Sequence, residues 1–324
     1  MAKFKVYYTI ELNEVATHIF ESNDFEVKLC SHNDEETYVK ELAEFQPDAI
    51  MCRTEAITAK MMDTCKNLKV IGKQGAGLDN IDMDHAHAKD ITVVYAPAGN
   101  ANAVAEHAVM LMLMCAKRFT YVDRQFRGGN FLVRMGMEHT YELGGKTLGM
   151  IGCGRISQLA MQKCKYGFGM NVIGYDPYLT QDKIGDLCEL KATAKEVWEQ
   201  ADFVSVHLPV VPSTEHSIGR EQFSWMKPTA SFINCARGAL IKENELVECL
   251  KDGTLFQAGL DVFEHEPIQE SSRELFDLDN VIMTPHMAAT TEQSVLNCCT
   301  SVANDIVAVC NGQEPKVKAQ KPKF

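Results

Sequence analysis

At 324 residues, the chain is long enough for about two domains of ordinary size. Apolar residues make up 46% of it, which is enough to build a core in each domain and argues against intrinsic disorder. The 32 Lys and Arg against 44 Asp and Glu give a net charge of −12. Nucleic-acid-binding proteins carry basic patches, so this charge argues against a nucleic-acid partner.

Cysteine use and hydropathy favour a cytoplasmic location. The twelve cysteines include no Cys-x-x-Cys pair, the spacing typical of redox and zinc sites. We therefore expect most of them to be buried thiols in a reducing compartment. No apolar run approaches the roughly 18 residues that span a bilayer, and residues 4–10 have the pattern of a strand rather than a signal peptide. We expect no membrane partner.

Short apolar runs alternate with helical patterns along the first third of the chain, which predicts a parallel sheet with crossover helices. The expected strands are Lys5–Ile10, Phe25–Leu29, Asp48–Cys52, Lys69–Ile71 and Thr92–Tyr95, and the helices include Glu35–Phe45 and Thr58–Cys65. The apolar stretch Ala103–Ala116 predicts a long helix, capped by Asn102, that crosses from one domain to the next.

Six further strands are expected in the middle of the chain: Thr147–Ile151, Asn171–Tyr175, Phe203–His207, Ser231–Asn234, Gln257–Leu260 and Val281–Met283. Six strands separated by helices match a doubly wound sheet of two mononucleotide-binding halves. One more helix, about Thr291–Cys310, follows and is expected to pack on the first domain.

A glycine-rich loop follows the first of these six strands. It reads Gly152-Cys153-Gly154-Arg155-Ile156-Ser157 and opens a helix. Gly152 permits the tight turn, and Gly154 lets the backbone approach a pyrophosphate at the helix N-terminus. Ser157 replaces the third glycine of this pattern, the one that permits close helix–strand packing; serine is small, so we expect the crossing to be only slightly wider. The loop predicts a dinucleotide site.

Asp176 ends the second strand of this unit, 24 positions after Gly152. A carboxylate there binds the ribose hydroxyls and repels a 2′-phosphate, and the following Pro177 and Tyr178 supply no arginine to offset that repulsion. The sequence therefore favours NAD over NADP. A glycine turn in an unrelated α/β protein is the competing interpretation, and the strand–loop–helix–strand–acid order disfavours it.

Three polar residues follow neighbouring strands of the same expected sheet. Arg237, Glu266 and His286 come after the strands at 231–234, 257–260 and 281–283. A guanidinium can bind a carboxylate through two parallel hydrogen bonds, and histidine can donate a proton to a carbonyl oxygen near neutral pH. A carboxylate beside the histidine favours its protonated form. Each residue has an ordinary structural alternative, but their shared place at strand ends indicates chemistry on a 2-keto acid.

Six segments of the chain resemble the D-isomer-specific 2-hydroxyacid dehydrogenases. They are KQGAGLDNID (73–82), NAVAEHAVMLML (102–113), GKTLGMIGCGRI (145–156), INCARGALI (233–241), AGLDVFEHEP (258–267) and NVIMTPHMAATT (280–291). The resemblance implies an α/β fold in which a Rossmann NAD-binding domain, residues 102–287, is inserted into a flavodoxin-like substrate-binding domain made of residues 1–101 and 288–324.

The resemblance also assigns site residues. It implies a catalytic trio of Arg237, Glu266 and His286, with His286 as the acid–base. Implied NAD contacts are Gly152, Gly154, Arg155, Ile156, Asp176, Leu208, Thr214, Cys235, Ala236, Arg237, Asp261, His286 and Ala288. Implied substrate contacts are Arg53, Lys73, Gly75, Ala76, Gly77 and Arg237. A homodimer formed around Ala103–Ala116 is implied as well.

The segments around Arg53 and Lys73 look most like the phosphoglycerate dehydrogenase branch, without its carboxyl-terminal regulatory domain. Lys73 and Phe131 stand where that branch usually has arginine and tryptophan. We expect NAD-dependent interconversion of a D-2-hydroxy acid and its 2-keto acid, with 3-phosphoglycerate as one candidate. Hydroxypyruvate, lactate and branched-chain 2-keto acids remain open, as does an NAD-sensing, corepressor-like binding protein. His85 and His87 lack a third ligand at metal spacing, so no metal is expected.

Overall fold

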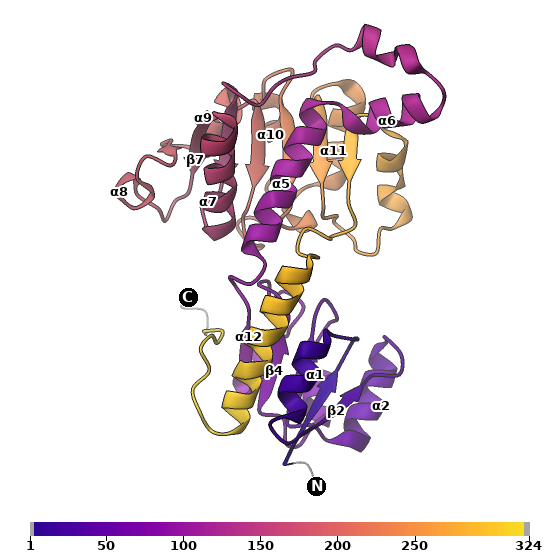
Figure 1. Ribbon diagram of the computed structural model, residues 1–324, viewed down its shortest axis with the longest axis vertical. Helices are drawn as coiled ribbons and strands as arrows, with labels where there is room; N and C mark the ends of the chain where they lie inside the picture. The colour runs from indigo at the N-terminus through magenta and orange to yellow at the C-terminus, as the bar shows by residue number, and fades with distance from the viewer. Residues whose placement is uncertain (1–2, 321–324) are drawn as a thin grey trace. The chain divides into compact units, whose positions relative to one another are not determined.

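The computed structural model describes residues 3–320 and divides the chain into two compact units. Unit 1 combines Met1–Asn100 with Thr290–Phe324, and unit 2 is Ala101–Ala289. Each unit contains its own parallel sheet with helices on both faces, so the fold is α/β with one unit inserted in the other along the chain (Figure 1).

The sheet of unit 1 has the strand order β2-β1-β3-β4-β5, which is the flavodoxin-like order. Its strands are β1 (Phe4–Tyr8), β2 (Phe25–Leu29), β3 (Ala49–Cys52), β4 (Val70–Lys73) and β5 (Thr92–Tyr95). All neighbouring pairs are parallel. Strands β3 and β4 are buried along their whole length, because helices cover both faces of the sheet.

Helices α1 (Glu14–Glu21) and α12 (Glu292–Cys310) share one hydrophobic core with this sheet (Figure 1). The other face packs against α2 (Glu35–Phe45), α3 (Ala59–Thr64) and α4 (Met83–Ala88). Glycine is required in β4 where α12 crosses it, because a Cβ at Gly72 would lie 2.4 Å from Cδ1 of Ile306. Close packing thus fixes α12 on the sheet of unit 1.

Unit 2 has a seven-stranded parallel sheet in the order β12-β11-β10-β9-β6-β7-β8. The strands are β6 (Thr147–Ile151), β7 (Asn171–Tyr175), β8 (Glu189–Leu190), β9 (Phe203–Val206), β10 (Ser231–Asn234), β11 (Gln257–Leu260) and β12 (Val281–Met283). The six expected strands are present, and β8 is an additional two-residue edge strand. The strand order reverses between β6 and β9, the position where doubly wound sheets bind ligands.

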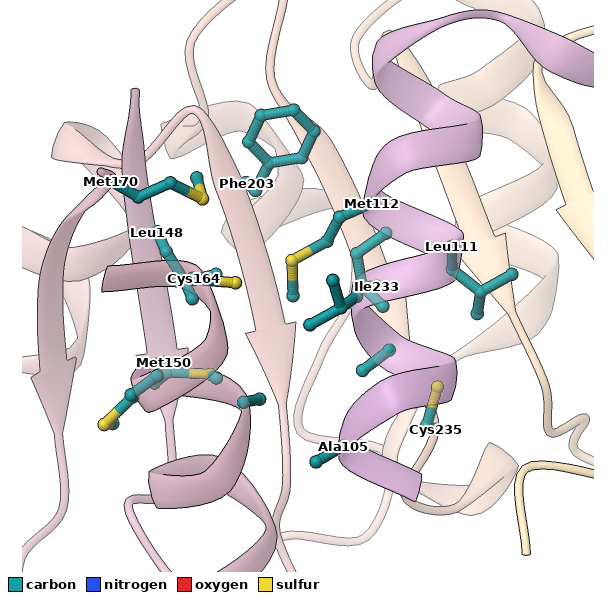
Figure 2. Packing of buried hydrophobic residues seen from close by; sticks show 14 of the residues in the cluster. Ala105, Leu111, Met112, Leu148, Met150, Cys164, Met170, Phe203, Ile233 and Cys235 are labelled. Carbon is teal, nitrogen blue, oxygen red and sulfur yellow. The ribbon is translucent and has the colours of Figure 1, made fainter. Parts of the chain in front are cut away.

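Two layers of helices cover this sheet. One layer contains α5 (Ala101–Ala116), α7 (Arg155–Gln162) and η2 (Lys163–Gly167), and the other contains α9 (Ala194–Gln200), α10 (Arg220–Trp225) and α11 (Glu243–Asp252). Figure 2 shows Leu111 and Met112 of α5 beside Ile233 of β10. The remaining elements are α6 (Phe119–Arg127), η1 (Phe131–Gly136), α8 (Gln181–Ile184), η3 (Gly238–Leu240) and η4 (Glu270–Asp277).

The start of α5 differs from the expectation. The helix begins at Ala101, so Asn102 lies in its first turn and is not its cap. The Asn102 side chain donates to Glu106 and accepts from Lys163 instead. The whole of α5 belongs to unit 2, so the prediction of a helix crossing between domains was also wrong.

Gly238 allows two strand-end loops of unit 2 to approach each other closely. A Cβ at this position would lie 1.9 Å from the carbonyl carbon and oxygen of Phe263, so the backbones of the two loops touch. One loop follows β10 and the other follows β11, and these strands are neighbours in the sheet. Only glycine permits this approach.

We predict that Gly238→Ala lowers the free energy of unfolding by about 3 kcal/mol, because the added methyl forces the two backbones apart. Urea denaturation followed by tryptophan fluorescence measures this change in unit 2, which contains both tryptophans, Trp198 and Trp225. Gly136→Ala is the matched control, because a Cβ there meets no atom within 4 Å. Equal stability of the two variants would contradict the prediction.

Candidate active site

The glycine loop turns tightly at the end of β6. Gly152 has φ +85°, and a Cβ there would lie 2.7 Å from the carbonyl oxygen of His207, which follows β9. Gly154 precedes α7 without a side-chain cap, and a Cβ on it would meet nothing within 4 Å. The start of α7 is therefore not capped by a side chain and has free space beside Gly154, which suits a helix N-terminus that binds an anion.

Two side chains brace this loop. Ser157 is fully buried, and its hydroxyl donates to the carbonyl oxygen of Gly152 at 2.6 Å. The Asp176 carboxylate accepts from the Cys153 amide at 2.9 Å through one oxygen and from the Tyr178 amide at 2.9 Å through the other. Asp176 thus lies beside the glycine loop, where the sequence spacing predicted it.

The loop after β10 carries Arg237. The buried side chain of Asn234 accepts from the Ala236 amide and donates to the Arg237 carbonyl oxygen, both at 2.9 Å. The Arg237 guanidinium donates to the Ala236 carbonyl oxygen at 2.7 Å. Cys235 is buried, and burial together with the nearby Asp261 carboxylate raises the pKa of its thiol well above the ordinary value. This cysteine stays protonated at neutral pH.

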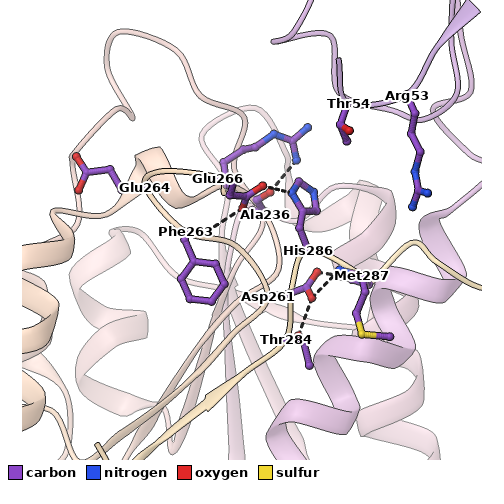
Figure 3. Close-up of polar contacts among 12 residues, drawn as sticks. Arg53, Thr54, Ala236, Asp261, Phe263, Glu264, Glu266, Thr284, His286 and Met287 are labelled. Carbon is purple, nitrogen blue, oxygen red and sulfur yellow. Dashed lines mark hydrogen bonds and ion pairs between the residues drawn. The ribbon is translucent and has the colours of Figure 1, made fainter. Parts of the chain in front are cut away.

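Glu266 and His286 are in direct contact. His286 Nδ1 lies 2.5 Å from one Glu266 oxygen, while the other oxygen accepts from the Phe263 amide at 3.0 Å (Figure 3). Because an ionised carboxylate only accepts hydrogen bonds, the imidazole proton of this pair resides on Nδ1. The His286 side chain is 38% exposed and the Glu266 side chain is 33% exposed, so the imidazole is accessible to a small molecule.

Asp261, at the end of β11, has no exposed surface and organises the loop that carries His286. Its carboxylate accepts from the Thr284 hydroxyl at 2.6 Å and from the amides of Met287 and Ala288 at 2.9 Å (Figure 3). Burial alone would raise the pKa of Asp261, but hydrogen bonds from His107, Thr284 and the two amides outweigh it, so the pKa is lowered. The carboxylate is ionised at neutral pH.

The loop after β9 contributes two of the expected NAD contacts. Leu208 lies against the glycine loop, because its Cδ2 would be 3.0 Å from a Cβ at Gly152. The Thr214 hydroxyl accepts from the Val211 amide at 2.9 Å and lies 2.6 Å from the Pro209 carbonyl oxygen. These bonds hold the loop in a compact turn.

The expected substrate contacts of unit 1 follow its strands β3 and β4. Arg53 donates to the Thr290 hydroxyl at 2.8 Å, and its own amide donates to the buried Glu55 carboxylate. Lys73 is buried and its ammonium donates to the Arg53 carbonyl oxygen. Gly75, with φ +148°, donates its amide to the Lys73 carbonyl oxygen at 2.9 Å. The Lys73 ammonium therefore lies beside the backbone of Arg53, at the carboxyl ends of β3 and β4.

The model of the NAD-binding domain of D-isomer-specific 2-hydroxyacid dehydrogenases matches residues 109–288. The chain belongs to the D-isomer-specific 2-hydroxyacid dehydrogenase family. The resemblance found in the sequence motifs is thereby confirmed, and so are the Rossmann fold of unit 2 and NAD as the cofactor.

Several relatives illustrate the breadth of this family. A D-3-phosphoglycerate dehydrogenase of Methanocaldococcus jannaschii is 39% identical over 95% of this chain, which spans 58% of that protein. A hydroxypyruvate reductase of Thermotoga maritima is 36% identical over 91% of this chain and 94% of its own length. Among solved structures, a glyoxylate reductase of Paecilomyes thermophila is 25% identical with a TM-score of 0.87, covering 98% of this chain and 99% of that one. The chain therefore spans about half the length of the phosphoglycerate dehydrogenases that it matches.

The residues around the glycine loop fit NAD. The open space above Gly154 and the uncapped start of α7 suit a pyrophosphate, and Arg155 is the first residue of that helix. The Asp176 carboxylate suits ribose hydroxyls. Tyr178, which follows it, is 91% exposed and offers no positive charge to a 2′-phosphate. Among the described residues, no helix could cross a membrane and no group of acidic, His and Cys side chains forms a metal site.

No motif in the sequence indicated His107 or Thr284. His107 Nε2 lies 2.8 Å from the Thr284 hydroxyl oxygen and 3.4 Å from the Asp261 carboxylate. The available signal was a histidine next to Glu106 in the otherwise largely apolar segment Ala103–Ala116. Its partner is 177 residues away, so spacing could not reveal the contact.

We predict that Asp176→Ala reduces the preference for NADH over NADPH by about tenfold or more, because the variant loses both the ribose acceptor and the repulsion of a 2′-phosphate. Fluorescence titration with each dinucleotide measures the ratio of dissociation constants. Asp182→Ala serves as a control, since Asp182 lies in the short α8 and leaves the glycine loop untouched. An unchanged ratio in Asp176→Ala would show that this carboxylate does not select the cofactor.

Proposed function

We propose that this protein is an NAD-dependent oxidoreductase that interconverts a D-2-hydroxy acid and its 2-keto acid. The observation that carries the proposal is the Glu266–His286 pair, which lies on the loops that follow neighbouring strands of the NAD-binding sheet. The roles that we propose for Arg237, Glu266 and His286 follow from this geometry and from the family.

His286 acts as the acid during reduction. When bound, NADH supplies the hydride for the keto carbon. Glu266 accepts a hydrogen bond from the Nδ1–H group of His286, and the Nε2 proton of the doubly protonated imidazole passes to the carbonyl oxygen. In the reverse direction neutral Nε2 accepts the hydroxyl proton. The second Glu266 oxygen is held by the Phe263 amide, which fixes the direction in which the imidazole presents Nε2.

Arg237 binds the carboxylate of the substrate through its guanidinium. Asn234 holds the backbone on both sides of Arg237, so little side-chain and loop freedom remains to be lost on binding. We also propose substrate contacts by Arg53, by Lys73 and by the backbone amides of Ala76 and Gly77, next to Gly75. Residues 1–101 and 288–324 would then form the substrate-binding domain, and residues 102–287 the NAD-binding domain.

The proposed NAD contacts follow the carboxyl ends of several strands of this sheet. They are Gly152, Gly154, Arg155, Ile156, Asp176, Leu208, Thr214, Cys235, Ala236, Arg237, Asp261, His286 and Ala288. All of these residues lie on the glycine loop, at the end of β7 or on loops that follow β9 to β12. The carboxyl ends of parallel strands meet at one edge, which supports a single extended binding surface.

For the substrate itself we favour a phosphorylated 2-keto acid such as phosphohydroxypyruvate. Arg53 and Lys73 place two cationic side chains in one loop region of unit 1, and cations suit a phosphate. The phosphoglycerate dehydrogenase relative matches 95% of the chain. An unphosphorylated hydroxypyruvate or glyoxylate is the alternative, which the two reductase relatives favour. We place the protein in the cytoplasm, where its twelve unpaired cysteines are stable.

Steady-state kinetics with NADH and a panel of 2-keto acids tests this function. The panel is phosphohydroxypyruvate, hydroxypyruvate, glyoxylate, pyruvate and 2-ketoisocaproate. We expect turnover with at least one of them, and a higher kcat/KM for phosphohydroxypyruvate than for hydroxypyruvate. A preference for the unphosphorylated acid would overturn the phosphate assignment and leave the reaction class intact.

His286→Ala is the control for chemistry in the same assay. It should lower kcat by about 1,000-fold or more while NADH binds with nearly unchanged affinity, because it removes only the proton donor. If the wild-type protein binds NADH tightly and reduces no acid of the panel, the corepressor-like sensor replaces the enzyme as the better explanation.

We also propose that the protein is a homodimer formed through α5 and the arm made of α6 and η1. No residue of the arm is buried, and its exposed apolar side chains are Phe119, Phe126, Phe131, Leu132 and Met135. A hollow on unit 2, beside α5, is lined by the apolar side chains of Val109, Met110, Leu113 and Phe168, with Glu106 and Lys163 also in its wall. Apolar surface of this extent is typical of a protein interface.

Sedimentation equilibrium measures the association. We expect twice the chain mass of 36.1 kDa for the wild type and a shift toward the monomer for the double variant Leu132→Asp with Met135→Asp, since buried charges oppose association. Tyr178→Asp is the matched control, as Tyr178 is exposed outside the arm. A monomeric wild type at micromolar concentration would rule out the dimer.

A further inference from the structure

A histidine remote from the Glu266–His286 pair is linked to it through buried hydrogen bonds. His107 lies on α5, and its side chain is only 10% exposed. The ring nitrogen Nε2 lies 2.8 Å from the Thr284 hydroxyl oxygen and 3.4 Å from the Asp261 carboxylate. Nothing in the proposed chemistry uses this imidazole directly.

Proton accounting fixes the direction of each bond. The Thr284 hydroxyl has one hydrogen, and it points to the ionised Asp261 carboxylate at 2.6 Å. Thr284 therefore accepts from His107, which must carry a proton on Nε2. The same proton faces Asp261 at the longer distance. His107 is thus the first donor in a series of hydrogen bonds that continues through Thr284 to Asp261.

At the other end of this series of hydrogen bonds, Asp261 fixes the backbone conformation of His286. Asp261 accepts from the amides of Met287 and Ala288, directly after His286, and its carbonyl oxygen accepts the His286 amide at 2.7 Å. His286 has φ +49°, a left-handed conformation that is sterically unfavourable for a residue other than glycine. This conformation persists because the bonds to Asp261 hold it.

We propose that His107 is a positioning residue: through Thr284 and Asp261 it fixes the left-handed backbone of His286 and therefore the direction of its imidazole. The proposal rests on the proposed role of His286 as the acid. His107 lies in a different segment of the chain from the loop that it restrains, so α5 and the β12 loop are fastened by this contact as well as by apolar packing.

Two substitutions separate the hydrogen bond from the volume of the side chain. His107→Leu fills the site and removes the donor, which leaves the Thr284 and Asp261 oxygens without it. His107→Gln retains an N–H near the position of Nε2. We expect His107→Leu to lower kcat by about tenfold with KM for the keto acid changed less than about twofold, and His107→Gln to restore most of kcat.

A second measurement does not depend on activity. Diethylpyrocarbonate modifies accessible imidazoles, and mass spectrometry of the peptide containing His286 reports its rate of modification. We expect the rate in His107→Leu to differ from the wild type by about threefold or more, because a loosened loop weakens the contact with Glu266. In His107→Gln the rate should stay near that of the wild type.

Cys115→Ala is the matched control for loss of packing. Cys115 is fully buried on the same helix, against Gly259 of β11, and makes no side-chain contact with the Asp261 network. If Cys115→Ala and His107→Leu alter kcat and His286 modification alike, a general loosening of α5 explains both and the proposal is overturned. Wild-type values in His107→Leu would overturn it equally.

Failure of the proposed function gives a different result. In that case the wild-type protein would reduce no acid of the panel, whereas the modification rate of His286 would still report on His107. Activity in the wild type, with its loss in His286→Ala and no effect in His107→Leu, would refute the positioning role alone.

Discussion

The strand-end loops of unit 2 depend on the hydrogen bonds that the buried carboxylate of Asp261 accepts. An ionised carboxylate without exposed surface is stable only when hydrogen bonds replace its hydration. Three of the donors come from Thr284, Met287 and Ala288, which all lie beyond β12. Satisfying this charge therefore requires the loop after β12 to fold over the end of β11. The left-handed backbone of His286 is a consequence of that fold.

The neighbouring loops are held by the same kind of constraint. Asn234 is buried, and its side-chain amide both donates to and accepts from the backbone at Ala236 and Arg237. Glu243 is nearly buried, and its carboxylate accepts the Glu264 amide at 2.9 Å and contacts the Ser272 hydroxyl. These groups exclude alternative loop conformations, because each would leave a buried polar atom unpaired. The polar groups proposed for chemistry are thereby set in place before a substrate arrives.

Sequence patterns located most of the strands but not the contacts between loops. Parallel strands covered on both faces are continuous apolar runs, so β6, β7 and β10 could be bounded to the residue. Strand β8 was missed because it has two residues and is set by pairing with β7 rather than by its own pattern. Asn102 looked like a helix cap, yet its amide bonds Glu106 and Lys163 within and beside the helix. Propensity at one residue cannot anticipate such partners.

Ser157, which stands where the dinucleotide-binding motif has its third glycine, shows how a departure from the motif is accommodated. Serine at this position was expected to widen the crossing of α7 over β6 slightly, since it is larger than glycine. Ser157 is nevertheless fully buried, and its hydroxyl donates to the carbonyl oxygen of Gly152. A buried hydroxyl without a partner would cost about 1–3 kcal/mol, whereas here it ties the first turn of α7 to the loop. The replacement thus restrains the backbone where glycine would have left it freer, and the loop keeps its open face at Gly154.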